Sequence, residues 1–492
     1  MKRFYQIIVL WVGTALLAAC GEPSYRMDAD DPRLPDIFPD YTDVTIPYNI
    51  APPNFSYLGD EPCRLLVGEE KDGFLLTGKE GLFSFPASRW KHLAEQQKGD
   101  SIRLTVVVLR DGKWTAFKPF FLHVAPEAID GWLSYRLIPP GYEGWKEMGL
   151  YQRNMESYEQ TAIYENKLTN DNCVNCHSYC NRDPERMMFH ARAEFGGTVV
   201  IDGKKIEKLR STLGADGGPS LTYPYWHPSG RYIAFSMNKT KQSFFNHRTE
   251  RVEVYDEYSD IVVYDARRHQ VVSTPLLRSA QAFETFPTFS PDGRQLYFCT
   301  AAAVDSVRQN YRQVKYSLCR ISFEPDGATF GTVVDTLYNA VREGGSASFP
   351  RLSPDGRHLV YTRHAYGNFS IWHKDADLWR IDLATGMSEP LVAANSDDTE
   401  SYHSWSGNSR WLVFSSRRID GLYTRPFIAY IDSAGKARKP FLLPQKDPVS
   451  FYRQLMFSYN IPEFMSAPVT ITPHRLAEKL RSPESVSVSV GN

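Results

Sequence analysis

The sequence lacks an excess of charge of either sign. Its 492 residues include 56 Lys and Arg against 57 Asp and Glu, which gives a formal net charge of −1. Binding to nucleic acid depends on a basic excess that meets the phosphates, so this balance argues against nucleic acid as a main partner. The 42% hydrophobic and 23% charged residues are typical of a soluble globular protein, and the length allows two or three domains.

Long apolar runs are also missing. Ile7 to Ala19 is largely apolar, but 13 residues are too few to cross a bilayer as a helix. A short positive region, Lys2-Arg3, precedes this run, and Leu17-Ala18-Ala19-Cys20 follows it, which is the order of a secretion signal. The end of the run resembles the lipobox of bacterial lipoproteins. An ordinary signal peptide that ends near a cysteine is the alternative.

The lipobox resemblance implies cleavage before Cys20 and a lipid on its thiol. Residues 1–20 are then the signal peptide and lipobox, and the lipid is the membrane attachment. We therefore expect a protein of the bacterial cell envelope, lipid-anchored and facing the periplasm. There, outside the cytoplasm, disulfides and covalent haem are both possible.

Familiar catalytic motifs are absent from the sequence. It contains no Gly-x-Ser-x-Gly elbow, no His-Glu-x-x-His zinc helix and no phosphate-binding Gly loop. Whether the protein is an enzyme therefore stays open.

The first third of the chain predicts a tether, a β-sandwich and a connector. Residues 21–54 are rich in Asp and Pro and are typical of a tether. Short apolar runs over 55–140, together with 13% aromatic residues, favour a β-sandwich with a hairpin at Arg110-Asp-Gly-Lys113 and one helix over 88–97. Residues 141–189 form a connector that we expect to be partly helical.

The second half contains an internal repeat. Four similar segments begin at Tyr223, Phe286, Phe349 and Tyr402, spaced by 63, 63 and 53 residues. Two of them carry Ser-Pro-Asp-Gly, which favours a type I turn, and an alternating apolar strand follows each turn. Each repeat therefore predicts one blade of a β-propeller.

These repeats resemble the TolB-like propellers, which share the Ser-Pro-Asp-Gly-Arg signature. The resemblance implies a mainly β fold with a propeller over residues 190–465 and a C-terminal tail over 466–492. We expect five blades, or else six. Residues 196–209 predict the outer hairpin of one further blade, and residues 451–466 are candidates for the strands that complete it and close the ring.

The most specific motif is Cys173-Val174-Asn175-Cys176-His177. It resembles the CxxCH motif of c-type cytochromes, in which two thioether bonds hold a haem and the adjacent His binds the iron. The resemblance implies one covalent haem c on Cys173 and Cys176, with His177 as the proximal ligand. The alternatives are a chance match, a zinc site that recruits Cys180, and a redox dithiol.

The second axial ligand is less determined by the sequence. His190 is our first expectation and Met188 our second, because both follow the motif closely and share one side of an extended segment. Met155 and His247 are weaker candidates, and a five-coordinate iron is the remaining alternative.

The remaining thiols allow two pairings, Cys299 with Cys319 and Cys180 with Cys63, but their spacing does not decide between disulfides and free thiols. Four other histidines are expected to be structural or surface residues: His227, His364, His373 and His403.

The whole chain is similar to a group of bacterial lipoproteins in which a β-sandwich and a CxxCH motif precede a TolB-like propeller. The predicted function is electron transfer by a lipid-anchored monohaem cytochrome whose propeller docks a redox protein partner. The alternatives are a propeller that binds a protein, peptide or glycan, and a haem enzyme with an open axial position.

Overall fold

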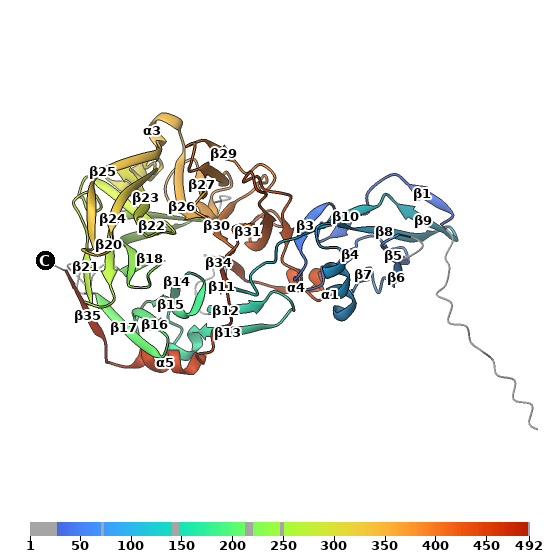
Figure 1. Ribbon diagram of the computed structural model, residues 1–492, viewed down its shortest axis with the longest axis horizontal. Coiled ribbons are helices and arrows are strands. Elements are labelled where there is room, and N and C mark those ends of the chain that lie inside the picture. The colour runs from blue at the N-terminus through green and yellow to red at the C-terminus, as the bar shows by residue number, and fades with distance from the viewer. Residues whose placement is uncertain (1–26, 70–72, 140–146, 212–219, 247–249, 491–492) are drawn as a thin grey trace, which may run out of the picture.

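The computed structural model describes residues 27–69, 73–139, 147–211, 220–246 and 250–490. It consists of a small N-terminal β domain joined to a larger β-propeller, and the two form separate lobes (Figure 1). Cys20 and His247, both named above as candidate sites, lie outside the described residues.

The N-terminal domain is built from two sheets and one helix. Its core contains apolar side chains from both sheets together with Trp90 and Ala94 of the helix α1. The seven-stranded sheet contains β1 (Ala29–Asp31), β3 (Val44–Pro47), β5 (Cys63–Val67), β6 (Phe74–Thr77), β8 (Ser101–Arg110), β9 (Lys113–Phe117) and β10 (Phe120–Ala125). The three-stranded sheet contains β2 (Ile37–Phe38), β4 (Phe55–Tyr57) and β7 (Leu82–Phe83), and α1 spans Ala87–Gln96.

Part of the predicted tether belongs to this domain. Within residues 27–54, β3 pairs in parallel with β10. Val44 and Ile46 lie on the same face of this strand and are buried in the core of the domain. The predicted hairpin at Arg110 to Lys113 joins β8 to β9, as expected.

The propeller has six four-stranded blades, which we label A to F. The strands of each blade, from the innermost outward, are β34 (Ser458–Met465), β11 (Trp132–Ile138), β12 (Gly149–Asn154) and β13 (Gln160–Glu165) in blade A; β14 (Val174–Cys180), β15 (Asp183–Ala191), β16 (Gly197–Asp202) and β17 (Lys205–Ser211) in blade B; β18 (Ser220–Trp226), β19 (Tyr232–Phe244), β20 (Val252–Asp265) and β21 (Gln270–Val272) in blade C; β22 (Ala282–Phe289), β23 (Gln295–Ala302), β24 (Ser317–Glu324) and β25 (Thr329–Tyr338) in blade D; β26 (Ser346–Leu352), β27 (His358–His364), β28 (Asp377–Asp382) and β29 (Ser388–Pro390) in blade E; and β30 (Glu400–Trp405), β31 (Trp411–Ser416), β32 (Arg425–Tyr430) and β33 (Phe441–Leu442) in blade F. Each inner strand contacts the next around the ring, and β34 contacts β14.

The propeller begins well before residue 190. The stretch 141–189, expected to be a helical connector, contributes β12, β13, β14 and β15 to blades A and B, with one 3-10 helix at Asn166–Thr169. The predicted outer hairpin at 196–209 corresponds to β16 and β17, but its inner strands are β14 and β15. Residues 458–465 instead complete blade A. Strand pairing outweighs the local helical signal here, because each blade needs four strands to bury its faces.

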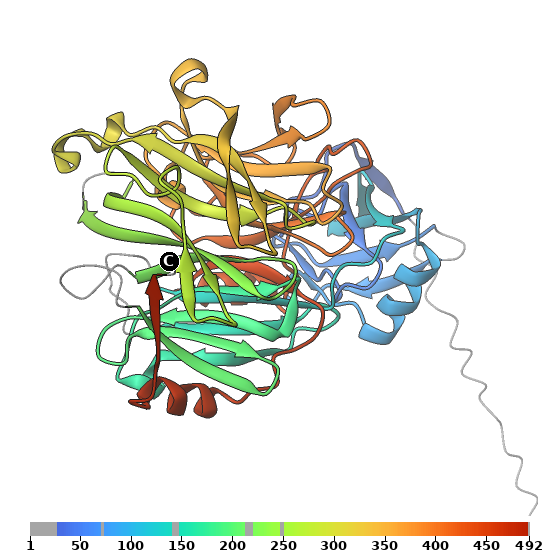
Figure 2. The same ribbon diagram turned by 60° about the vertical axis from the view of Figure 1, so that its left-hand side comes forward.

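The C-terminal segment is also part of the propeller. The helix α5 (Pro473–Arg481) packs Leu476 and Leu480 into the core between blades A and B, and β35 (Val486–Val490) pairs in parallel with both β17 and β21. This strand runs upward from α5 at the edge of the ring and joins the outer edges of blades B and C (Figure 2).

The two lobes share a continuous apolar contact. Trp411, Val413 and Phe441 of blade F belong to the same core cluster as the residues of the N-terminal domain, and Tyr41 donates to the carbonyl of Leu442 at 3.0 Å. A further helix, α4 (Pro448–Gln454), lies between blade F and β34 in the chain and contacts β4.

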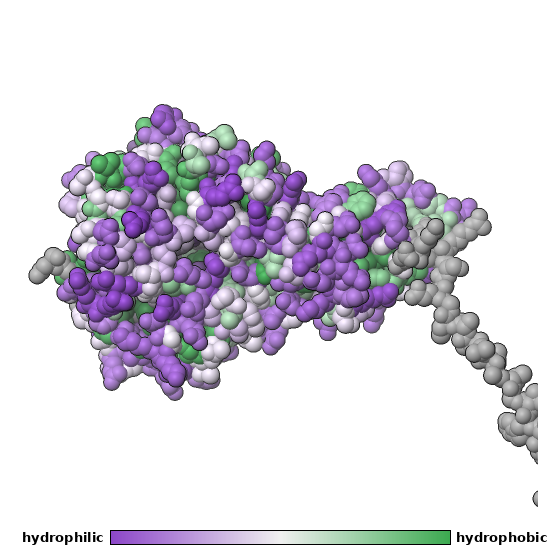
Figure 3. Space-filling view, viewed as in Figure 1, coloured by the Kyte–Doolittle hydropathy of each residue, from purple (hydrophilic) through white to green (hydrophobic). Residues whose placement is uncertain are grey.

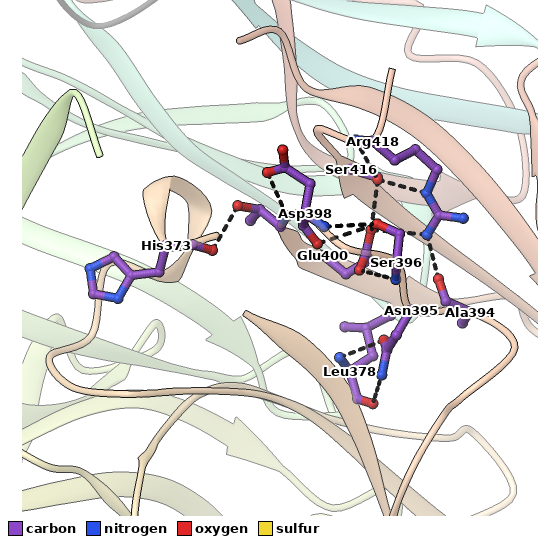
Figure 4. A network of polar contacts seen from close by, with 10 residues as sticks. His373, Leu378, Ala394, Asn395, Ser396, Asp398, Glu400, Ser416 and Arg418 are labelled. Carbon is purple, nitrogen blue, oxygen red and sulfur yellow. Dashed lines mark hydrogen bonds and ion pairs between the residues drawn. The ribbon is translucent and has the colours of Figure 1, made fainter. Parts of the chain in front are cut away.

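A buried ion-pair network fixes the entrance to blade F (Figure 4). Glu400 is fully buried and accepts from Arg418 at 2.9 Å, from Ser416 at 2.8 Å and from the hydroxyl of Ser396 at 2.7 Å. Asn395 bonds the backbone of Leu378 on the neighbouring blade. The network therefore holds the start of the inner strand β30 against blade E.

Candidate functional site

One strained position recurs in the inner strand of every blade. Six residues have positive φ values between 47° and 54°, and each lies at a β-bulge between the first and second strands of its blade. These residues are Cys176, Tyr223, Phe286, Phe349, Tyr402 and Ile461. A positive φ costs a non-glycine residue on the order of 1 kcal/mol, so the ring closure itself must hold the strain.

Four aromatic rings at this position fill the middle of the channel. The ring centroids of Phe286 and Phe349 are 4.1 Å apart, those of Tyr223 and Phe286 are 4.5 Å apart, and those of Phe349 and Tyr402 are 4.8 Å apart. Blades C to F supply these rings, which we call the aromatic plug. Blades A and B supply the smaller Ile461 and Cys176 instead, so the thiol of the CxxCH motif replaces an aromatic ring.

The plug forms the floor of a cavity of about 310 Å³ on the side of the Ser-Pro-Asp-Gly turns. We call it the turn-side cavity. His177 and Cys176 line one wall, and Arg351, from the opposite blade of the ring, lines the other. Five buried polar atoms of its lining have no hydrogen-bond partner: His177 Nδ1, Tyr179 Oη, Arg182 Nε, His403 Nδ1 and Ser404 Oγ.

His177 lies buried between blades B and A. Its Nε2 is 3.2 Å from the hydroxyl oxygen of Ser134 on β11, and its ring packs edge-on against Tyr179. Burial, with a smaller effect from the positive charge of Arg136, lowers the pKa of His177 to about 3. The imidazole is therefore neutral at physiological pH, which is the form that binds a metal.

Both thiols of the motif are free. Cys173 precedes β14 and is half-buried, while Cys176 is buried at the bulge, where burial raises its pKa. The segment is extended, so at about 3.3 Å per residue the two Cα atoms lie roughly 10 Å apart along the strand. The motif thus enters an inner strand, whereas the sequence predicted a partly helical connector over residues 141–189.

The side chains present are those that covalent haem attachment uses. They are one free thiol just before the inner strand β14, a second free thiol within it, and a neutral imidazole with one unpartnered nitrogen. Binding of an iron at His177 Nε2 would require the contact with Ser134 to be released.

His190 and Met188 are not brought together with His177. In the sheet of blade B, His190 lies opposite Asn175 and Thr198, and Thr198 lies opposite Leu209, so these residues share one face of the sheet. Met188 is on the same face, where it packs with Trp226 and Phe235 of blade C. His177 faces blade A instead, so the sheet of blade B separates it from both expected second ligands.

His190 is occupied by a different contact. Its Nδ1 lies 2.9 Å from the hydroxyl oxygen of Thr198, and burial lowers its pKa to about 3. Met155 lies in the core between the two lobes. Among the side chains that share the cavity with His177 and have an unpartnered polar atom, Tyr179 and His403 are of the types that bind haem iron.

The other thiols do not pair. Cys299 and Cys319 lie on adjacent strands, but Cys299 opposes Leu318 and the two side chains enter different core clusters. Cys63 belongs to the N-terminal domain and Cys180 to blade B. All four are free.

The opposite mouth of the channel is covered by the long β19–β20 hairpin. Glu253 on β20 accepts from Tyr366 at 3.2 Å and lies 3.3 Å from His373 Nε2. Asp256 accepts from Asn238 at 2.7 Å and from Asn368 at 2.6 Å. These contacts tie blade C to blade E, and we call this half of the channel the hairpin side.

Sequence reasoning missed the arginines of the channel. Arg136 donates to the carbonyl of Val174 and to the side chain of Asn175, the two residues between the motif thiols. Arg351 donates to Thr288 Oγ1 at 3.0 Å and lies over the ring of Tyr225. No sequence signal distinguishes these arginines from surface ones, because the burial of Arg136 and the partial burial of Arg351 depend on the ring closure.

Comparison with known proteins does not assign the chain to a family. No family model matches the chain, and no curated protein matches it. Among solved structures the chain is similar to TolB from Acinetobacter baumannii, at 13% identity and a TM-score of 0.44, covering 77% of this chain and 85% of that one. It is also similar to an oligogalacturonate lyase in complex with manganese, at 10% identity and a TM-score of 0.36, covering 64% and 74% of the two chains. Within the described ranges no helix is long and apolar enough to cross a membrane.

Proposed function

We propose that this protein is a monohaem c-type cytochrome of the bacterial envelope, anchored through a lipid on Cys20. Cys173 and Cys176 would hold the haem, and His177 would bind its iron. One observation carries the proposal: the CxxCH motif supplies the channel position of blade B, where four other blades place an aromatic ring. The motif thereby puts a free thiol and a neutral imidazole at the centre of the propeller.

The bound haem would supply one-electron redox chemistry. The protein's own residues would fix its surroundings. The edge-on contact with Tyr179 would hold the imidazole of His177 in place once Ser134 is released, while the aromatic plug would limit the access of water to Cys176 from the side of blades C to F. Tyr179 and His403 share the cavity with His177 and would be available to the iron, whereas His190 would not.

A redox protein partner is the proposed recipient or donor of the electron. One haem stores one electron, which favours transfer to a partner over the turnover of a two-electron substrate. On the face shown in Figure 3, hydrophilic residues dominate both lobes and hydrophobic ones are scattered among them. Such a surface suits a transient encounter better than a permanent apolar interface.

The test is expression in a host with cytochrome c maturation, followed by a reduced-minus-oxidised absorption spectrum. We expect a c-type spectrum and a haem that stays on the chain after acid-acetone extraction. Cys176→Ala should abolish covalent attachment, whereas Cys180→Ala, a change in another buried free thiol of β14, should leave it intact. His177→Ala should keep the haem attached but alter its spectrum. Folded wild-type protein without haem would refute the proposal.

The turn-side cavity favours a second candidate function, a propeller that binds a small or extended ligand. Its five polar atoms without a hydrogen-bond partner provide hydrogen-bonding capacity that the chain leaves unused, and the half-buried Arg351 adds a positive charge to the wall. Glu463 lines the same cavity, and burial raises its pKa to about 7. Ligand binding by haem-free protein that Arg351→Gln weakens would support this function.

A further inference from the structure

Blades E and F build the wall of the turn-side cavity that lies across from the CxxCH motif. We call this part of the lining the E–F wall; it consists of Arg351, His403, Ser404 and Trp405. Trp405 Nε1 donates to the carbonyl of Arg351 at 3.1 Å. His403 Nε2 lies 2.9 Å from the carbonyl oxygen of Val360, the residue that pairs with Arg351 between β26 and β27. The imidazole therefore lies beside the strand that carries Arg351.

The guanidinium of Arg351 is only partly used by the protein. Its Nη1 donates to Thr288 Oγ1 at 3.0 Å and to the carbonyl of Pro350 at 2.9 Å. Among the described residues its Nε and Nη2 make no hydrogen bond, and no carboxylate lies within ion-pair distance. The acidic residue of the lining, Glu463, instead accepts from the backbone N–H of Tyr179 at 3.3 Å. The free edge of Arg351 offers two parallel N–H groups, which match the two oxygens of a carboxylate.

His403 offers a hydrogen-bond acceptor to the same cavity. A backbone carbonyl can only accept, so His403 Nε2 carries the proton that it donates to Val360. Burial lowers the pKa of His403 to about 3, so the imidazole is neutral and its Nδ1 keeps a lone pair. His403 is 3% exposed, and neither its Nδ1 nor the neighbouring Ser404 Oγ has a hydrogen-bond partner. A buried acceptor without a donor is costly, so a ligand that donates is expected there.

We propose that the E–F wall binds a hydroxy acid, whose carboxylate accepts from Nε and Nη2 of Arg351 and whose neighbouring hydroxyl donates to His403 Nδ1. A hydroxyl suits the neutral imidazole, whereas an ammonium group would favour a carboxylate partner. Ser404 Oγ provides a contact for a second hydroxyl. An acidic sugar and a small 2-hydroxy acid share this chemistry, and the experiment separates them.

The hydroxy-acid site rests on the second candidate function, ligand binding in the turn-side cavity, and names its ligand. It does not depend on the haem, because blade E lies opposite blade B in the ring and His177 lines the other wall. The volume of about 310 Å³ lies at the lower end of the range of small-molecule pockets, which suits a ligand of this size.

The experiment is a calorimetric titration of the full chain as purified. Lactate, propionate and alanine share one carbon skeleton and differ only in a hydroxyl, a hydrogen or an ammonium group at one carbon. We expect lactate to bind about fivefold more tightly than propionate, which lacks the donor for His403, and more tightly than alanine. Glucuronate should bind about tenfold more tightly than glucose, which lacks the carboxylate for Arg351.

Two variants separate the two contacts. Arg351→Gln should weaken lactate, propionate and glucuronate about tenfold and leave glucose unchanged. His403→Gln keeps a donor for the carbonyl of Val360 but removes the Nδ1 acceptor, so lactate should fall to the affinity of propionate. The matched control is His227→Gln, which should bind like wild type: His227 is also buried, with Nε2 3.0 Å from the carbonyl oxygen of Gly293, but it does not line the cavity. Circular dichroism checks folding, and Arg351→Lys, which loses the parallel pair but keeps the charge, replaces Arg351→Gln where that variant fails to fold.

Glucuronate that binds more tightly than lactate would identify an acidic sugar as the ligand, and the reverse order a small hydroxy acid. Equal affinities for lactate and propionate, unchanged binding in Arg351→Gln, or tighter binding of alanine or inorganic phosphate would each overturn the hydroxy-acid site, as would no binding at all.

The proposals fail in different ways. A chain that binds lactate through Arg351 and His403 but attaches no haem in a maturation host would refute only the cytochrome. A chain with covalent haem that binds no hydroxy acid would refute only the hydroxy-acid site. Binding of a different ligand that Arg351→Gln weakens would keep the second candidate function and refute the hydroxy acid.

Discussion

Asp256 shows how a single buried carboxyl makes the stability of this propeller depend on pH. Burial raises its pKa to about 7, against the lowering effect of the hydrogen bonds from Asn238 and Asn368. Between about pH 4 and pH 7 the folded state keeps a proton that the unfolded state releases. The stabilising contribution is therefore complete below pH 4 and is lost as the pH rises through 7.

Asp256→Asn should remove this dependence, because its amide oxygen can accept the same two hydrogen bonds. At about 1.4 kcal/mol per pKa unit, the variant should gain about 3 kcal/mol relative to wild type between pH 5 and pH 8. Urea unfolding at both pH values measures the difference, and Asp111→Asn in an exposed turn is the control. A difference that does not change with pH would contradict the assignment.

At the scale of residues, the sequence predicted the chemistry of the motif better than its surroundings. Cys173, Cys176 and His177 could be identified from their spacing alone. Their extended conformation could not, because a bulge in an inner strand depends on the five other blades. The sequence placed His190 and Met188 on the same side of an extended segment, and both lie on one face of β15 in the structure. What the sequence could not show is that His177 turns to the other face.

The repeat made four blades predictable and hid two. Blades C to F share the segment from the aromatic residue to the turn, whereas blade B has Cys180-Asn181-Arg182-Asp183 in place of Ser-Pro-Asp-Gly. Blade A has no such turn after β34, because the chain continues into the C-terminal segment. The Pro that follows the strained position in blades C, D, E and A, as in Ile461-Pro462, is the signal that links blade A to the others.

The strand β35 makes an element-level prediction. It pairs with β17 and β21, and Val488 is fully buried in the core between blades B and C, while Val490 is 54% exposed. Val488→Ala should lower the free energy of unfolding by about 2 kcal/mol through lost burial and the cavity left behind. Val490→Ala should change it by less than about 0.5 kcal/mol. Equal effects in chemical denaturation would show that β35 does not join the two blades.

At the scale of the whole molecule, the ring is closed by strands from distant parts of the chain. Blade A combines β34 from the C-terminal region with β11, β12 and β13, which follow the N-terminal domain. Tyr459 and Phe464 of β34 also belong to the apolar core that joins the two lobes. Closure and domain contact therefore depend on the same strand.

A chain ending at Met456 should consequently fail to form a cooperative propeller. It would lack the inner strand of blade A, leave the edge of β11 unpaired and expose the apolar residues that β34 covers. The control is a chain ending at Ser482, which keeps β34 and α5 and loses only β35. We expect the control to elute as a compact monomer with one cooperative thermal transition, and the shorter chain to aggregate or unfold without one. Equal stability of the two would mean that blade A closes without β34, which the inter-strand pairing of β34 with β11 argues against.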